Sequence, residues 1–172
     1  MNVTDDKRLR RWRGALRVLL VGFMTMIFLF STQDGDRSSD TSGPFTRFVL
    51  SIVRPDFGTL PAFEQQEVYD TADFIVQKCA HFTEYALLGL LIELLVRTHP
   101  WHRRVYSWLF GTLYAASDEL HQLFVSARSA MWQDVVLDSA GVLVGVLLGC
   151  VLMTRWIARH GSIQPKDEPN GP

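Results

Sequence analysis

Cysteine is scarce in this sequence, and neither sign of charge is in excess. The 172 residues include only two cysteines, which cannot form a disulfide framework, so the small disulfide-rich secreted folds are excluded. The 17 Lys and Arg residues and the 18 Asp and Glu residues nearly cancel. This balance leaves no basic footprint for nucleic acid, and we expect no nucleic-acid partner. A glycine-rich phosphate loop and a serine-nucleophile elbow are also missing from the sequence.

Apolar residues are abundant, and they are gathered into runs. Hydrophobic residues make up 48% of the chain. The mean hydropathy is nevertheless only +0.09, because the apolar runs alternate with connectors rich in acids or arginines. The length suits a single domain. This segregation of apolar and charged segments argues against an ordinary soluble enzyme and favours a membrane protein.

Four apolar runs are candidates for membrane-spanning helices. They cover residues 14–30, 81–96, 105–125 and 134–156. The second and third runs carry charged residues at one end, so a soluble helical bundle is the alternative by hydropathy alone. The first run also resembles a signal peptide, but no small-x-small cleavage site follows it, and we expect an uncleaved anchor.

The charges of the connectors predict how the spans are oriented. The arm of residues 1–13 is basic, connector 31–77 has eight acids against three arginines, and connector 97–104 has three arginines and no acid. Because basic connectors stay in the cytoplasm, both termini are predicted to lie inside, in a plasma (inner) membrane. Residues 157–172 are predicted to form a flexible cytoplasmic tail, and residues 14–156 the membrane domain.

The long outer connector, residues 31–77, is predicted to contain helices of its own. The Ser-Gly-Pro at residues 42–44 can start a helix with proline at its first position, and Pro55 would end it. One face of this helix is apolar, as in a helix that lies in a membrane interface; that face holds Phe45, Phe48, Val49, Ile52 and Val53. A second helix is predicted from Pro61 into the second span. Packing of these helices on the span ends is the alternative.

The predicted fold class is therefore all-α, an integral membrane four-helix protein with amphipathic interfacial helices in its first extracytoplasmic loop. In this topology the ionisable residues of three spans lie at one level near the outer leaflet. They recur three or four residues apart, so those of each span share one helical face. Charged groups at that depth normally face protein or water, which predicts an outward-facing polar pocket. Its candidate residues are His81, Glu84, Asp118, His121, Gln122, Arg128, Asp134 and Asp138, with Lys78 and Glu119 at the rim.

Three smaller patterns concern packing. Gly141, Gly145 and Gly149 form a row of small residues on the fourth span that allows another helix to approach closely. Glu93 is expected to reach Arg97, one turn later on the second span. Glu119 lies about 100° round the helix from its neighbour Asp118, so we expect it at the interface rather than in the pocket.

The polar motifs also carry a family resemblance. They read KCAHFTEY from Lys78 in the second span, DELHQLF from Asp118 in the third, and DVVLD from Asp134 in the fourth. With the Ser-Thr-Gln that follows the first span, they resemble the VanZ-like family over about residues 15–155. The namesake of that family is an accessory protein of glycopeptide-resistance clusters, associated with reduced susceptibility to teicoplanin. The resemblance thus implies a role in the cell envelope or in antibiotic tolerance, without supplying a mechanism.

Three classes of function fit such a pocket. We favour recognition of a cell-envelope component, such as a lipid-linked precursor or a glycopeptide-type ligand, because the pocket would face the side on which such antibiotics act. An intramembrane hydrolase is the second class, working by acid/base chemistry or through a divalent metal, the one cofactor considered. The ligands of that metal would be His81, Glu84, Asp118 and His121. The third class is a hydrogen-bond network that only fixes helix register.

Overall fold

The computed structural model describes residues 3–32, 35–96, 98–125 and 131–160. In these ranges every regular element is helical, which confirms the all-α prediction. The elements are α1 (Val3–Ser31), α2 (Gly35–Val53), the 3-10 turn η1 (Phe57–Thr59), α3 (Ala62–Leu95), α4 (Pro100–Gln122) and α5 (Trp132–His160).

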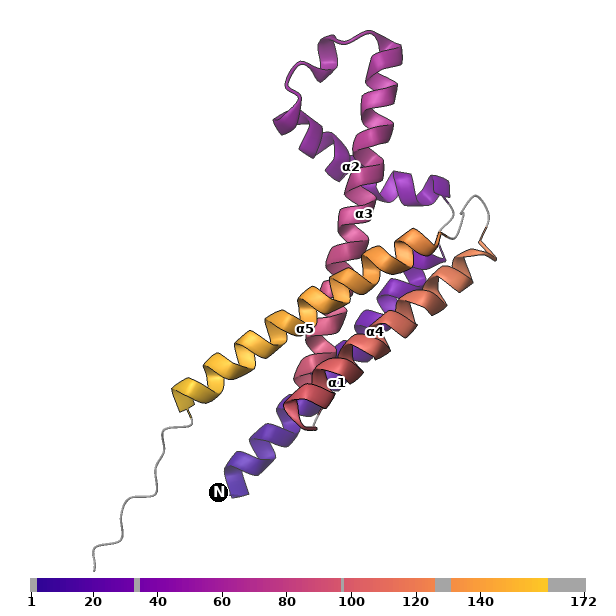
Figure 1. Ribbon diagram of the computed structural model, residues 1–172. Coiled ribbons are helices and arrows are strands. Elements are labelled where there is room, and N and C mark those ends of the chain that lie inside the picture. Colours follow the sequence, from indigo (N-terminus) through magenta and orange to yellow (C-terminus); the bar gives the residue numbers. More distant parts are fainter. Residues whose placement is uncertain (1–2, 33–34, 97, 126–130, 161–172) are drawn as a thin grey trace, which may run out of the picture.

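Helix α3 is the centre of the arrangement. It contacts each of the other four helices. Its C-terminal half crosses α1, α4 and α5, which run alongside one another, whereas its N-terminal half projects beyond them and carries α2 and η1 (Figure 1). The molecule therefore has a helical body and a smaller head, and α3 is common to both.

The core of the body is apolar and takes residues from all four body helices. Its buried members are Ile27 of α1, Tyr85, Leu88 and Ile92 of α3, Ala115 of α4, and Val142 and Val146 of α5. Leu20, Phe23 and Met24 of α1 pack against this cluster at its edge.

Glycines bring α3 and α5 into backbone contact, as the sequence predicted. A Cβ atom on Gly141 would lie 2.5 Å from the Phe82 carbonyl oxygen. A Cβ on Gly145 would overlap the Ala86 carbonyl oxygen and lie 2.8 Å from the Leu90 nitrogen. The row of small residues on α5 therefore packs on α3, and larger side chains there would force the two helices apart.

The head is held together by a buried carboxylate on α3. Asp73 accepts hydrogen bonds from the Ser42 and Thr46 hydroxyls of α2, at 2.6 and 2.7 Å, and from Gln77 Nε2 at 2.9 Å. The predicted start of α2 at residues 42–44 is wrong, because the helix begins at Gly35 and contains Pro44. Ser42 and Thr46 lie on either side of Pro44, and both side chains are hydrogen-bonded to α3. These contacts help α2 to remain helical at the proline.

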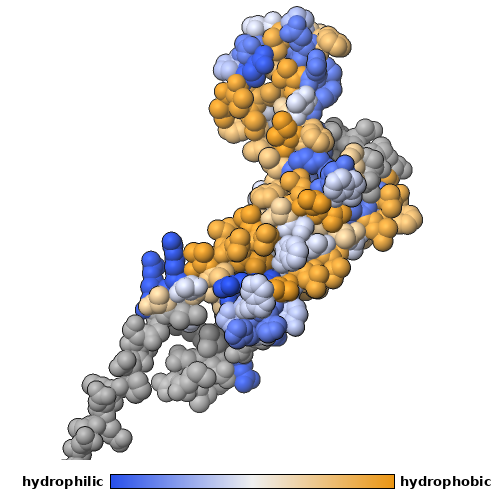
Figure 2. Space-filling view, viewed as in Figure 1, coloured by the Kyte–Doolittle hydropathy of each residue, from blue (hydrophilic) through white to orange (hydrophobic). Residues whose placement is uncertain are grey.

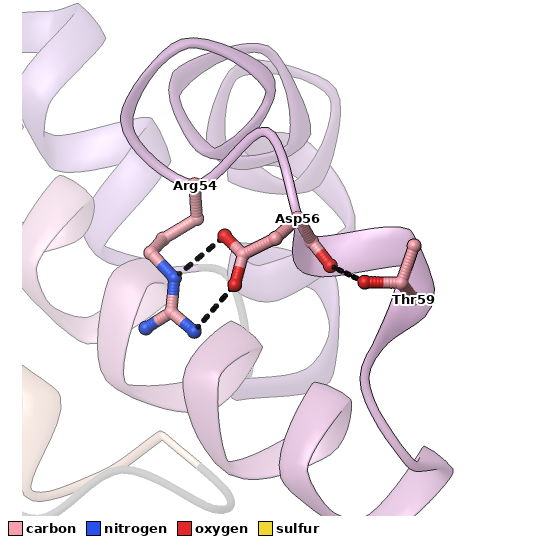
Figure 3. Close-up of polar contacts among 3 residues, drawn as sticks. All are labelled: Arg54, Asp56 and Thr59. Atoms are coloured by element: carbon pink, nitrogen blue, oxygen red, sulfur yellow. Dashed lines mark hydrogen bonds and ion pairs between the residues drawn. The ribbon is translucent and has the colours of Figure 1, made fainter.

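The connection from α2 to α3 lies at the far end of the head and contains the 3-10 turn η1. Helix α2 ends at Val53, before Pro55, as predicted. Arg54 Nε and Nη2 donate to the two carboxylate oxygens of Asp56 at 3.1 and 3.2 Å, and the Thr59 hydroxyl donates to the Asp56 carbonyl at 2.7 Å (Figure 3). The hydrogen bonds from Arg54 hold the pKa of the Asp56 carboxyl below its ordinary value.

Two of the described helices are long and apolar enough to span a membrane. These segments are Arg10–Ser31 of α1 and Trp132–Trp156 of α5. Much of their surface is exposed and apolar, and apolar side chains cover a large part of the middle of the body (Figure 2).

The predicted second helix from Pro61 and the predicted second span form one continuous helix, α3. Helix α4 ends at Gln122, before the predicted limit at residue 125.

A buried ion pair joins α3 and α4 at the opposite end of the body from the outer polar residues. Arg103 Nε donates to Glu93 Oε1 at 2.6 Å, and the Glu93 side chain is completely buried. Arg97, the predicted partner of Glu93, lies outside the described residues. Glu93 Cγ also lies near Gly149, since a Cβ on that glycine would be 2.9 Å away. The pair therefore adds a polar contact to the same glycine-lined seam.

The glycine seam makes a direct prediction about stability. Replacement of Gly145 by alanine should destabilise the fold by about 1–3 kcal/mol, because the added methyl has no space and α3 and α5 must separate. The measurement is thermal or denaturant unfolding of the purified protein in detergent. Gly22→Ala is the matched control, since a Cβ there meets nothing within 4 Å, and it should leave stability unchanged or slightly higher. Equal stability of the two variants would contradict the backbone contact.

Candidate functional site

The polar residues predicted to share one level of the second, third and fourth spans lie close together, in the middle of α3, near the end of α4 and near the start of α5. At the edge of the group, Lys78 of α3 donates to Asp134 of α5, with Nζ and Oδ1 2.5 Å apart. The Lys78 ammonium also lies 5.3 Å from the centre of the Phe74 ring. Both members of the pair are partly exposed. Lys78 therefore links α3 to α5 and also lies at the rim of the polar group.

Two carboxylates lie deeper than this pair, and a third, that of Glu84, is partly exposed beside them. Asp138 of α5 is only 3% exposed and Asp118 of α4 only 4%. Asp138 interacts electrostatically with Asp118 and Asp134, and Glu84 of α3 interacts with Asp118. One acid from each of three helices is therefore brought to a common centre. We call Glu84, Asp118 and Asp138, with Tyr85 described below, the acidic centre.

The remaining acid and amide are held by local hydrogen bonds. Gln122 Nε2 donates to Asp118 Oδ2 at 3.2 Å, one turn apart on α4. Glu119 Oε2 accepts the backbone N–H of Met131 at 3.1 Å. The expectation that Glu119 is only interfacial is wrong, since its side chain is buried. Met131, just before α5, thus meets a face of α4 that spacing alone placed away from the cluster.

The two histidines behave differently. His81 Nδ1 lies 4.0 Å from Glu84 Oε2 on the same face of α3. The His121 ring of α4 packs against Phe28 of α1, with ring centroids 4.7 Å apart. Helix α1 therefore forms part of the wall, in addition to the three helices that the sequence predicted. The pattern of charged residues could not predict this contact, because Phe28 lies in an apolar run without charged residues nearby.

Two tyrosines complete the centre and were not among the predicted site residues. The Tyr85 side chain is fully buried and interacts with both Asp118 and Asp138. Its ring faces that of Tyr114 on α4 at 6.4 Å, and the Tyr114 hydroxyl donates to the Met24 carbonyl of α1 at 2.7 Å. The spacing of both tyrosines places them on the polar helical faces, since Tyr85 is four residues after His81 and Tyr114 is four residues before Asp118.

Several polar atoms of this site are buried without a hydrogen-bond partner. They include Asp138 Oδ1, the Tyr85 hydroxyl and His121 Nε2. Most buried polar atoms in native proteins have a partner, and each exception calls for an explanation. Since the three come from three different helices, the site offers hydrogen-bonding capacity that the described protein groups do not use.

The predicted metal ligands do not assemble. Among the described residues, no three or more His, Cys, Asp or Glu side chains are positioned to hold a metal ion. His81 and Glu84 are adjacent, but His121 is directed to Phe28 and Asp118 to Gln122. Arg128, a predicted site residue, lies outside the described residues.

The Lys78–Asp134 pair gives a testable coupling. Lys78→Met leaves Asp134 without its ammonium partner and should destabilise the protein by about 1.5–3 kcal/mol, the usual worth of a charged hydrogen bond. The charge-exchanged double variant, Lys78→Asp with Asp134→Lys, should recover part of that loss. Unfolding of both variants in detergent checks this. If the exchange recovers nothing, the pair does not join α3 to α5.

Comparison with known proteins identifies the family of this chain. No curated protein and no solved structure matches it significantly. The VanZ/LLP1 family model, however, matches residues 16–153, which include all of α3 and α4, parts of α1 and α5, and the whole acidic centre. Together with the two helices able to span a membrane, this match indicates a membrane protein. The chain belongs to the VanZ/LLP1 family.

Proposed function

We propose that this protein is a four-span membrane protein whose acidic centre faces outward and recognises a component of the cell envelope. The observation that carries the proposal is the set of buried polar atoms without a partner, contributed by Asp138, Tyr85 and His121. Buried polar atoms with unused hydrogen-bonding capacity in a low-dielectric site can be satisfied by a ligand that has polar groups.

The proposed topology has both termini in the cytoplasm. Helices α1 and α5 are apolar enough to span, and α3 and α4 pack between them as the other two spans. Charged side chains of the proposed spans are turned into the protein, where Glu93 of α3, Asp118 of α4 and Asp138 of α5 are buried. Inward orientation is what a lipid environment requires of ionisable residues. The basic connectors then lie inside, and the head lies outside.

The head fits the outer membrane surface. Helix α2 uses Gly43, Thr46 and Leu50 to pack on α3, whereas Phe45, Phe48 and Ile52 are each about 60% exposed. An exposed apolar face of this kind on a helix with a polar opposite face is typical of helices in the headgroup region. In this arrangement α2 lies in the outer interface, near the entrance of the acidic centre.

A purely structural role is the second candidate, and specific contacts favour it. Lys78–Asp134 joins α3 to α5, and Glu119 fixes the loop at Met131. Interhelical polar contacts in membranes are worth about 0.6–2 kcal/mol each, enough to fix helix register. These contacts surround the acidic centre, however, and leave Asp138 Oδ1 unused.

Thiol labelling tests the orientation. Cys79 is exposed, one residue after Lys78, and should react with a membrane-impermeant maleimide in intact cells. In a Cys79→Ser, Cys150→Ala background, a cysteine introduced by His102→Cys should react only after the membrane is permeabilised. Labelling of that position in intact cells would contradict the proposed topology.

Native mass spectrometry tests the recognition. The protein extracted from its own membrane should carry an envelope component, and Asp118→Asn should reduce its occupancy about tenfold or more, because a charge-assisted hydrogen bond is weakened. Asp70→Asn, the same change at an exposed position of the head, is the matched control and should retain the component.

The other outcomes of this experiment separate the candidates. Loss of folded Asp118→Asn protein, with wild-type protein empty, would favour the structural role. A component that leaves wild-type protein chemically cleaved, but stays intact on the variant, would favour acid/base hydrolysis. Equal occupancy of wild-type and variant protein would place the binding elsewhere.

A further inference from the structure

We infer that the group recognised by the acidic centre is a primary ammonium, held between Asp138, Asp118 and the Tyr85 hydroxyl. This inference rests on the proposed recognition function and names the chemistry of its ligand. Its starting point is the kind of atoms that meet there. An ionised carboxylate is an acceptor only, and a phenol oxygen can accept while its O–H donates to a neighbouring carboxylate, so the centre presents mostly acceptors to whatever enters it.

An ammonium group matches this set of acceptors. It has three N–H donors and no acceptor, and the centre offers acceptors from three helices: Asp138 on α5, Asp118 on α4 and Tyr85 on α3. Among the described residues, Asp138 Oδ1 and the Tyr85 oxygen have no partner within hydrogen-bond distance, and both side chains are more than nine-tenths buried. A hydroxyl ligand would satisfy fewer acceptors, and a phosphate would place like charges together.

The negative charge of the site also favours an ammonium ligand. Asp138 interacts with Asp118, Asp134 and Glu119, all of the same sign. The lysine that reaches this group, Lys78, is already bound to Asp134 at 2.5 Å. An entering cation therefore meets a negative field that Lys78 has only partly neutralised, and a buried carboxylate is stabilised when an opposite charge pairs with it.

The aromatic residues of the site favour a cation as well. The rings of Tyr85 and Tyr114 lie 6.4 Å apart beside the acids. The faces of such rings attract a cation within about 6 Å. Tyr114 is itself fixed by its hydrogen bond to the Met24 carbonyl, so its ring is held in place before a ligand binds.

The surroundings point to a lipid as the carrier of the ammonium. Leu120, near the end of α4, and Leu123 and Phe124, just after it, are 60% or more exposed. In the proposed topology these side chains face the outer leaflet next to the acidic centre. A phospholipid with an amine headgroup can place its ammonium in the centre while its acyl chains remain in the bilayer. A soluble amine shares the headgroup chemistry and is distinguished below.

The experiment uses the full-length protein in detergent and three lipids added in turn. These are phosphatidylethanolamine, which has a primary ammonium; phosphatidylcholine, which keeps the charge but has no N–H donor; and phosphatidylglycerol, which has no cation. Native mass spectrometry should show phosphatidylethanolamine bound about tenfold or more tightly than phosphatidylglycerol, with phosphatidylcholine weaker than phosphatidylethanolamine. Equal or tighter binding of either of the other two lipids would overturn the inference.

Two variants and a control assign the binding to the acidic centre. Asp138→Asn should lower the affinity for phosphatidylethanolamine about tenfold or more. Tyr85→Phe removes one oxygen that has no partner, so the fold should be unaffected while the affinity falls several-fold. Asp70→Asn should bind as the wild type does. Unchanged binding by folded Tyr85→Phe and Asp138→Asn proteins would overturn the inference.

A competition arm separates a lipid from a soluble amine. Displacement of the lipid by glycerophosphoethanolamine, which lacks acyl chains, would show that the headgroup alone is recognised. Failure to displace would assign the ammonium to a lipid. The inference also fails separately from the proposed function: a component lost in Asp118→Asn but lacking an amine would overturn the ligand class and leave recognition standing.

Discussion

The contact between the backbones of α3 and α5 is the constraint on which the rest of this structure depends. It exists because α5 carries glycine every fourth residue, at Gly141, Gly145 and Gly149, where any Cβ would meet α3. Without a strong hydrophobic drive between helices in lipid, close van der Waals packing of this kind supplies much of the association. The register it sets places Asp138, three residues before Gly141, next to the Glu84–Tyr85 turn of α3.

That register explains why so many carboxylates are accommodated in one place. A charged group inside a membrane protein is costly unless paired or hydrogen-bonded, and the edge of the cluster meets this requirement with Lys78–Asp134 and Glu119–Met131. Asp138, at the centre, keeps an unused oxygen. Paired groups at the edge, around a centre with an oxygen that no described residue uses, form the arrangement on which the proposed recognition rests.

Helix α3 also couples the head to this site. Asp73, which holds α2 by hydrogen bonds from Ser42 and Thr46, lies five residues before Lys78, about 7.5 Å along a helix. A rigid helix of 34 residues thus carries the α2 contact and the acidic centre.

Local patterns in the sequence determined the helical class, the glycine seam and most members of the cluster. Spacings of three and four residues are enough to place His81 with Glu84, or Asp118 with Gln122, on one helical face. Only the tertiary structure decided what meets between helices. Phe28 beside His121, Glu119 bound to Met131 and the passage of α2 through Pro44 all depend on contacts between distant segments. Periodicity within one helix is blind to such contacts, because the rotation of each helix about its axis is set by packing against its neighbours.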